Sequence, residues 1–325
     1  METILAKSKQ PNVKERADPW VYKHTDNYYY FTGSVPGYKS IELRRARSLD
    51  HLENAERVTV WQAPETGIQS QLIWAPEIHY LNNKWYIYFA ASDHSKLRNE
   101  KHHHRMFVIE NVQENPMNNQ WQEKGQITTQ FDSFSLDATI FTHKEQLYYV
   151  WAQLDPRIPS NSNLYISKMR NPWTLKGKQT LLSIPEYNWE KIGFKVNEGP
   201  AVIQHKDKVF ITYSASATDE NYAMGLLWAF KDSDLLDGFS WYKLQDPIFK
   251  TCEETQFYGP GHNSFTKGKN DQTDILIFHA RPKKNDFTDP LSNPNRHTYA
   301  QTFTWDKQGF PIFGKPGIEM NFKGE

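Results

Sequence analysis

Residues 75–89 read Ala75-Pro76-Glu77-Ile78-His79-Tyr80, then a polar turn at 82–84, then Trp85-Tyr86-Ile87-Tyr88-Phe89. The first run begins with a Pro and an acidic residue and continues with mainly apolar and aromatic residues. The second run is strongly aromatic. Two such runs on either side of an Asn-rich turn are typical of a β-hairpin. This stretch therefore predicts two antiparallel strands.

Four other segments share this plan, and the plan recurs at a nearly constant interval. Successive units are 59, 60, 61 and 64 residues apart, which is room for four short strands each. Five β units of similar length predict an all-β, five-bladed β-propeller in which residues 1–325 form one domain. A third strand is predicted in each unit, at residues 40–47, 105–111, 163–169, 222–230 and 298–305. The polar residues that mark the units are Asp18, Glu77, Asp137, Glu198 and His262.

The position of these markers predicts a functional site. The first strand of each propeller blade faces the central channel, so equivalent residues of successive blades form a ring. Carboxylates crowded into one channel repel and desolvate one another, which raises carboxyl pKa values and suits a general acid. Two carboxylates facing each other across a pocket can cleave a glycosidic bond, and a wide separation favours inversion. We therefore predict a sugar-cleaving pocket at Asp18, Asp137 and Glu198.

Composition limits the partners and the location. Lys+Arg and Asp+Glu both number 38, so there is no basic excess to hold a nucleic acid. No window approaches the roughly 18 apolar residues of a membrane span, and the first ten residues lack the apolar core of a secretory signal. A lone Cys252 rules out an internal disulfide framework and fits a reducing compartment. These features predict a cytoplasmic protein with neither a nucleic-acid nor a membrane partner.

The motifs around the markers resemble those of glycoside hydrolase family 43, in the same order and from about residue 15 to 315. The resemblance implies that Asp18 is the general base and Glu198 the general acid of an inverting enzyme. It further implies that Asp137 positions the acid and raises its pKa. Ala138 departs from the pattern, since many members carry Pro there. The motifs are Arg16-Ala17-Asp18-Pro19, Trp74-Ala75-Pro76-Glu77, Leu136-Asp137-Ala138, Asn197-Glu198-Gly199-Pro200 and Gly259-Pro260-Gly261-His262.

The same resemblance implies roles around the pocket. Arg281 would reach the pocket and contact sugar hydroxyls or the acid, and the alternative is a surface or inter-blade salt bridge. Trp74 would form a pocket wall, although core packing explains it equally well. His262 would lie beneath the sugar near a structural calcium ion held largely through water, although a hydrogen-bonded core histidine explains it equally well. The chemistry itself needs no cofactor. Zinc is disfavoured because no second His or Cys stands at a ligand spacing.

Three further expectations concern residues outside the catalytic set. Glu77 is assigned a structural role. Residues 187–195 are predicted to form a rim loop on the leaving-group side of the pocket. The run His102-His103-His104 lies among Lys and Arg residues, and we expect a solvated loop there.

The substrate prediction rests on the resemblance. The motifs around Asp137, Glu198 and His262 are most similar to those of the arabinofuranosidase branch, which implies removal of terminal α-L-arabinofuranosyl residues from arabino-oligosaccharides. A cytoplasmic enzyme would meet short oligosaccharides, which favours exo action. The alternatives are a β-xylosidase of the same family, a non-catalytic sugar-binding propeller, and a glycoside phosphorylase, which would need a basic phosphate cluster.

Overall fold

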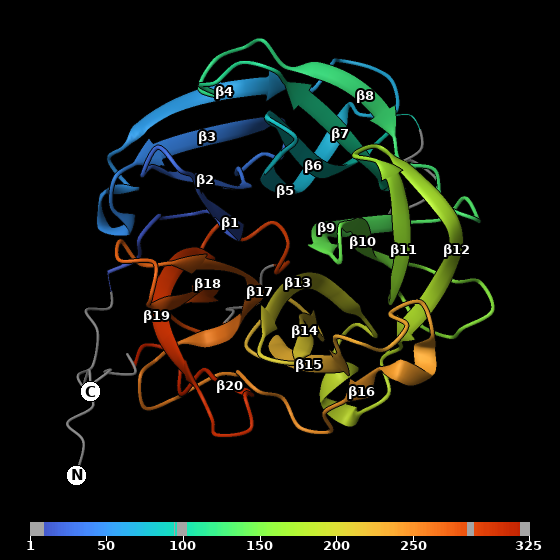
Figure 1. Ribbon diagram of the computed structural model, residues 1–325. Helices are drawn as coiled ribbons and strands as arrows, with labels where there is room; N and C mark the ends of the chain where they lie inside the picture. Colours follow the sequence, from blue (N-terminus) through green and yellow to red (C-terminus); the bar gives the residue numbers. More distant parts are fainter. Residues whose placement is uncertain (1–9, 94, 96–102, 285–288, 319–325) are drawn as a thin grey trace.

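The computed structural model describes residues 10–93, 95, 103–284 and 289–318, and it is a five-bladed β-propeller, as the repeat predicted. Five four-stranded antiparallel sheets surround a central axis (Figure 1). Each sheet is one continuous segment of chain. The predicted third strands agree with the observed ones to within two residues at each end. The described part of the chain contains only three-residue 3-10 helices, and none of them could cross a membrane.

The strands follow one another in chain order within every blade. Blade 1 contains β1 (Ala17–Lys23), β2 (Tyr29–Ser34), β3 (Ser40–Ala46) and β4 (Glu56–Gln62). Blade 2 contains β5 (Gln71–Leu81), β6 (Lys84–Ser92), β7 (Arg105–Asn111) and β8 (Gln122–Gln126). Blade 3 contains β9 (Ser135–His143), β10 (Gln146–Gln153), β11 (Asn163–Asn171) and β12 (Thr174–Ser183). Blade 4 contains β13 (Asn197–His205), β14 (Lys208–Ala215), β15 (Ala223–Phe230) and β16 (Tyr242–Lys243). Blade 5 contains β17 (Tyr258–Lys267), β18 (Asp274–Arg281), β19 (His297–Trp305) and β20 (Pro311–Ile312).

Every innermost strand carries a β-bulge at the same place. Two of its residues oppose a single residue of the second strand, at 18–19, 75–76, 137–138, 199–200 and 262–263. Bulges bend a strand and redirect its side chains, which is why they recur beside functional sites. The first bulge residue has a positive φ in all five blades: 55° at Asp18, 44° at Ala75, 49° at Asp137, 54° at Gly199 and 44° at His262.

These bulges correct the register predicted from the sequence. Asp18, Asp137 and His262 are equivalent, as expected, because each is the first bulge residue of its strand. Glu198 lies one residue before the first bulge residue of its strand, and Glu77 lies two residues after the first bulge residue of its own. The polar markers alone could not show this, since the bulge position is occupied by Ala75 in blade 2 and by Gly199 in blade 4.

Aromatic side chains fill the spaces between neighbouring sheets. Trp85 is fully buried and packs against Tyr22 of β1, Tyr30 of β2 and Tyr80 of β5 at centroid distances of 5.7, 4.8 and 4.7 Å. Burying an aromatic ring between two sheets provides a large apolar contact area. The aromatic second strands of the repeat therefore hold adjacent blades together and fix the ring that carries the site.

The ring closes between blade 1 and blade 5. The backbone of Val13 pairs with Thr298 of β19, so the segment before β1 joins the sheet of the last blade. The Asn12 side chain accepts a hydrogen bond from the backbone of Ala300 at 2.8 Å. Ser264 of β17 donates to the carbonyl oxygen of Pro19 at 2.9 Å. The first and last blades are thus connected by backbone pairing and by buried side chains.

Candidate active site

A pocket of about 780 Å³, its open mouth included, lies where the innermost strands begin. Its floor is polar and includes all three predicted acids together with His262. Its walls are mainly apolar and come from blades 2, 3 and 4 and from the loop before β19. Such a pocket, with a few convergent polar groups among apolar walls, is the usual form of a small-ligand site. The wall residues are Trp74, Phe134, Leu136, Phe194, Val196 and Leu291.

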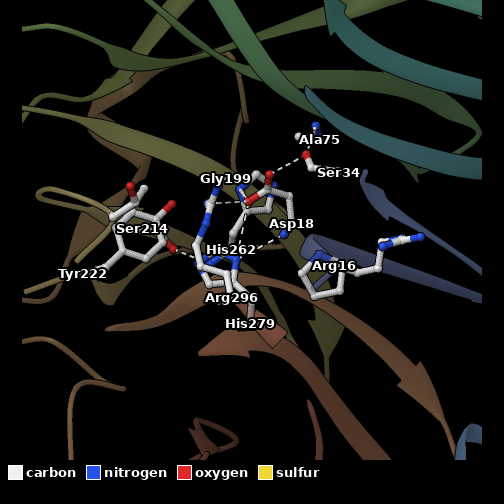
Figure 2. Close-up of polar contacts among 12 residues, drawn as sticks. Arg16, Asp18, Ser34, Ala75, Gly199, Ser214, Tyr222, His262, His279 and Arg296 are labelled. Carbon is white, nitrogen blue, oxygen red and sulfur yellow. Dashed lines mark hydrogen bonds and ion pairs between the residues drawn. The ribbon is translucent and has the colours of Figure 1, made fainter. Parts of the chain in front are cut away.

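Asp18 is held as an anion by its neighbours (Figure 2). Ser34 donates a hydrogen bond to Oδ2 at 2.6 Å, and Arg296 Nη1 lies 3.4 Å from Oδ1. His262 Nδ1 lies 3.3 Å from the same oxygen, while the backbone N–H of Asp18 donates to His279 Nδ1 at 3.1 Å. Burial alone would raise the pKa of the Asp18 carboxyl, but His262 and Arg296 hold it well below its usual range. An ionised carboxylate here can accept a proton from water.

Glu198 has the opposite character. Burial raises its pKa to about 7, and the nearby charge of Asp18 acts in the same direction. The Tyr222 hydroxyl donates to Oε1 at 2.9 Å and, with Arg296, limits the rise. A carboxyl that carries a proton for part of the time near neutral pH suits a general acid. Two carboxyls in one pocket therefore have pKa values pushed in opposite directions.

Asp137 acts on the peptide that carries Glu198. Its Oδ2 accepts a hydrogen bond from the backbone N–H of Gly199 at 3.1 Å and lies 3.7 Å from His262 Nδ1. Burial raises the pKa of Asp137 well above its usual value, and the charges of Glu198 and Asp18 add to this. Gly199 suits this position because a Cβ there would lie 3.1 Å from the His262 ring, at a φ that favours glycine.

His262 does not present a ready set of calcium ligands. Its Nδ1 faces the carboxyls of Asp18 and Asp137, and burial lowers its pKa although the charge of Asp18 acts in the opposite direction. Calcium prefers six to eight oxygen ligands. Within residues 10–93, 95, 103–284 and 289–318, no group of three His, Cys, Asp or Glu side chains could hold a metal ion. The described residues therefore do not fit direct coordination, and an ion beside His262 would take its ligands largely from water.

Trp74 lies in the pocket wall, which is one of the two positions expected for it. Its ring stacks on His104 with centroids 3.9 Å apart, and His104 meets the edge of Phe134 at 5.6 Å. His104 is fully buried, and its Nε2 lies 3.1 Å from the carbonyl oxygen of Leu72. The predicted solvated loop is therefore wrong for His104, because this side chain supports Trp74; His102 lies outside the described residues.

Arg281 does not line the pocket, contrary to the prediction. Its side chain is buried, and its Nε and Nη2 donate to the carbonyl oxygen of Thr218 at 3.0 and 2.9 Å. Nη2 also donates to Pro290 at 2.7 Å. Thr218 and Leu291 do line the pocket, so Arg281 supports two segments of its rim. The cation on the pocket floor is Arg296, which the sequence analysis missed.

Three functional neighbours escaped the sequence analysis: Arg296, Tyr222 and His279. Arg296 and Tyr222 lie just before the third strands of their blades, and His279 lies in a second strand, so none is part of a first-strand motif. Glu77 lies outside the pocket lining and is paired with His79 Nε2 at 3.1 Å. The predicted rim segment 187–195 contributes Phe194 to the wall.

The arrangement can perform acid–base chemistry on a small polar substrate. An anionic carboxylate and a proton-bearing carboxyl line one pocket, beside a buried guanidinium that can donate to hydroxyl groups. An apolar wall that includes Trp74 can pack against the face of a sugar ring. One carboxyl can protonate a leaving oxygen while the other activates water, which is the division of work in inverting glycosidases.

Comparison with known proteins gives a consistent result. The sequence matches glycosyl hydrolases family 43 over residues 9–311. It is 50% identical over 306 residues to an extracellular exo-α-(1→5)-L-arabinofuranosidase of Streptomyces avermitilis, covering 94% of this chain and 63% of that protein. It is 47% identical over 305 residues to α-L-arabinofuranosidase 43 of Humicola insolens, of which it covers 62%. A crystal structure of α-L-arabinofuranosidase from Lactobacillus brevis superposes with a TM-score of 0.91 at 52% identity, covering 97% of this chain and 98% of that one.

Proposed function

This chain belongs to glycosyl hydrolase family 43, and we propose that it removes terminal α-L-arabinofuranosyl residues from arabino-oligosaccharides by an inverting mechanism. The observation that carries the proposal is that Asp18 and Glu198 line one pocket whose surroundings shift their pKa values in opposite directions. The names of the relatives, which include exo-α-(1→5)-L-arabinofuranosidase, support the substrate and the exo mode. The chain covers just under two thirds of the length of the first two relatives. The proposed activity therefore concerns these 325 residues and not the remaining third of those relatives.

The mechanism assigns one proton transfer to each carboxyl. Glu198 donates its proton to the glycosidic oxygen as the bond from that oxygen to the anomeric carbon breaks. Asp18 accepts a proton from a water molecule, whose oxygen forms the new bond to the anomeric carbon on the opposite face. Asp137, through the N–H of Gly199, keeps the Glu198 peptide in place. Asp18 then releases its proton to solvent and Glu198 takes one up, so both carboxyls return to their starting states.

Two predictions from the sequence remain proposals. A calcium ion held through water beside His262 would stabilise the channel and take no part in proton transfer. The cytoplasmic location is also retained as a proposal, although two of the relatives are named as extracellular enzymes. Cell fractionation with a marker enzyme for each compartment tests it.

A panel of 4-nitrophenyl glycosides tests the proposed function. The wild type should hydrolyse the α-L-arabinofuranoside and release L-arabinose from 1,5-linked arabinobiose. Because general acid catalysis contributes about 10²–10⁴-fold, Glu198→Gln should lose roughly that factor on arabinobiose. Asp18→Asn should lose activity on both substrates because it removes the carboxylate that is held ionised in the pocket. Glu110→Gln, a buried carboxyl on β7 outside the pocket, is the matched control and should keep its activity.

The product and the substrate preference separate the alternatives. Proton NMR during the first minutes should show the β anomer of arabinofuranose, because inversion of an α-glycoside gives the β product. Initial release of the α anomer would contradict the mechanism. Faster turnover of the xyloside would indicate a β-xylosidase. Absence of hydrolysis with retained sugar binding would indicate a binding propeller.

A further inference from the structure

We propose that Tyr222 is a positioning residue whose hydroxyl aims the Glu198 carboxyl at the leaving oxygen and whose ring ties the acid side of the pocket to the base side. The inference deepens the proposed function and rests on it, since it takes Glu198 as the proton donor to a glycosidic oxygen. It stands on the contacts of Tyr222 with Glu198, His279 and the glycines of β17.

The first contact is the hydrogen bond from the Tyr222 hydroxyl to Glu198 Oε1 at 2.9 Å. Among the described residues, it is the only hydrogen bond that the Glu198 carboxyl forms. Tyr222 is 1% exposed, so its ring cannot turn away from this partner into solvent. A free glutamate side chain samples several rotamers, so holding it in one conformation has an entropic cost. A single bond to one oxygen restricts those rotamers and leaves Oε2 without a partner, available to hold the transferable proton.

The second contact joins Tyr222 to the general base. Its ring lies parallel to that of His279, with an interplanar angle of 8° and centroids 5.5 Å apart. His279 Nδ1 in turn accepts the backbone N–H of Asp18 at 3.1 Å. Figure 2 shows Tyr222 and Asp18 on opposite sides of the His262 and His279 rings. One stack of side chains thus connects the residue that gives the proton with the residue that takes one.

The third observation concerns the strand on which Tyr222 packs. A Cβ at Gly261 would lie 2.6 Å from the Tyr222 ring, and a Cβ at Gly259 would overlap the carbonyl oxygen of Asp219. That oxygen accepts the backbone N–H of Tyr222, which closes the turn preceding β15. The sequence Gly259-Pro260-Gly261 therefore leaves room for both the Tyr222 ring and the turn that presents it.

The leaving group shows whether Tyr222 acts through Glu198. Departure of a sugar alcohol needs a well-aimed proton, whereas 4-nitrophenolate leaves readily without one. A misaimed Glu198 should therefore slow hydrolysis of arabinobiose and spare hydrolysis of the nitrophenyl glycoside. General damage to the pocket would lower both rates together.

The experiment compares Tyr222→Phe with the wild type on these two substrates. We expect kcat on 1,5-linked arabinobiose to fall by about tenfold or more, a part of the 10²–10⁴ that a general acid supplies. We expect kcat on 4-nitrophenyl α-L-arabinofuranoside to stay within about threefold and KM for both substrates to change little, because the removed hydroxyl does not line the pocket. Tyr165→Phe is the matched control, since its buried hydroxyl donates to Asp155 at 2.8 Å away from the site. It should show equal kcat losses, if any, on the two substrates.

Each outcome decides the proposal. Equal losses of kcat on both substrates, or no loss on arabinobiose, would overturn the positioning role while leaving the proposed function intact. A rise in KM with kcat unchanged would also overturn it, since Tyr222 would then act in binding. A wild type that hydrolyses neither substrate would refute the proposed function and this inference with it. If Tyr222→Phe unfolds, Gly261→Ala is the second variant, because its Cβ displaces the Tyr222 ring while the hydroxyl is kept. It must then show the same result, a larger loss of kcat on arabinobiose than on the nitrophenyl glycoside.

Discussion

Replacing Arg296 by Met should move both limbs of the pH profile of hydrolysis to higher pH. Arg296 Nη1 lies 3.4 Å from Asp18 Oδ1, and the two side chains are only 5% and 10% exposed. Unit charges about 4 Å apart attract by about 4 kcal/mol at an effective permittivity of 20. Since one pKa unit corresponds to about 1.4 kcal/mol, loss of this partner can raise the pKa of Asp18 by up to about three units.

The direction of the shift follows from the charges on the pocket floor. In the wild type, the pKa of Asp18 lies far below its usual value, so Asp18 stays ionised throughout the working pH range. In Arg296→Met, burial is offset by His262 without the guanidinium, so the acidic limb should move to higher pH by up to about three units. Arg296 also opposes the rise in the pKa of Glu198, so its removal should move the alkaline limb above its wild-type position near pH 7. Arg296→Lys keeps the charge and should shift both limbs less.

The assay is kcat/KM for 1,5-linked arabinobiose from about pH 2 to pH 9, which reports the free enzyme's essential acid and base. Each variant is first incubated at every pH and returned to pH 6 to show that it remains folded. Arg45→Met removes a cation from the pair with Glu56 on blade 1, outside the pocket, and serves as the control. An Arg296→Met profile whose acidic limb coincides with that of the wild type would refute the reasoning, because Arg296 would then not control Asp18.

Three further predictions concern the wall, the channel and the rim of the pocket. Trp74→Ala should raise KM for the arabinofuranoside several-fold, since an aromatic contact contributes about 0.5–1.5 kcal/mol. Trp74→Phe keeps a ring and should retain most of the affinity. Equal KM values for Trp74→Ala and the wild type would show that Trp74 does not contact the substrate. Removing calcium with a chelator should lower the Tm by a few degrees, and adding it at a hundredfold above Kd should restore about 2.7 kcal/mol; a Tm that ignores calcium would contradict an ion beside His262. Glu190→Gln should cost about 3–5 kcal/mol in urea unfolding, because Lys243 Nζ, 2.7 Å from the buried Glu190 Oε1, would lose its counterion. Burial alone would raise the pKa of Glu190, but Lys243 holds it below its usual value. The ion pair therefore stabilises the fold above about pH 4.3, and its contribution is lost as the pH falls through the lower pKa of folded Glu190. If Glu190→Gln and the wild type lost stability equally on acidification, this reasoning would be contradicted.

The sequence was sufficient for the fold because the repeat is expressed in local patterns. Each aromatic second strand follows a polar turn, as at residues 82–84, and hairpins of this kind are visible without knowledge of distant contacts. The register of the inner ring was harder to predict. Polar residues near each strand start served as markers, but the bulge falls on Ala75 in one blade and on Gly199 in another. Because Asp, Ala, Gly and His all occupy the first bulge position with a positive φ, the residue type alone does not reveal where the bulge lies.

The acids were predictable and their partners were not. Asp18, Asp137 and Glu198 belong to first strands, where the repeat brings them together. Arg296 comes from the loop before β19, and Tyr222 precedes β15, so their arrival at the pocket depends on loop paths that no local pattern encodes. Arg281 was preferred because it resembles the family's pocket arginine, yet its buried guanidinium donates to main-chain carbonyls. The two glycines of β17 were a usable signal for Tyr222, since bare Cα atoms in a buried strand indicate a close neighbour.

The closure between blade 1 and blade 5 has a consequence for the order in which activity can arise. Asp18 belongs to the first blade, but His262, His279 and Arg296, which set its charge and orientation, all belong to the last. During synthesis, the first four blades can form while the base still lacks these partners, and Glu198 is then already in place. The enzyme should therefore gain turnover only when the final blade docks. During refolding, hydrolysis should therefore recover at the same rate as blade 5 docks. Recovery before blade 5 docks would show that Asp18 works without its partners in that blade.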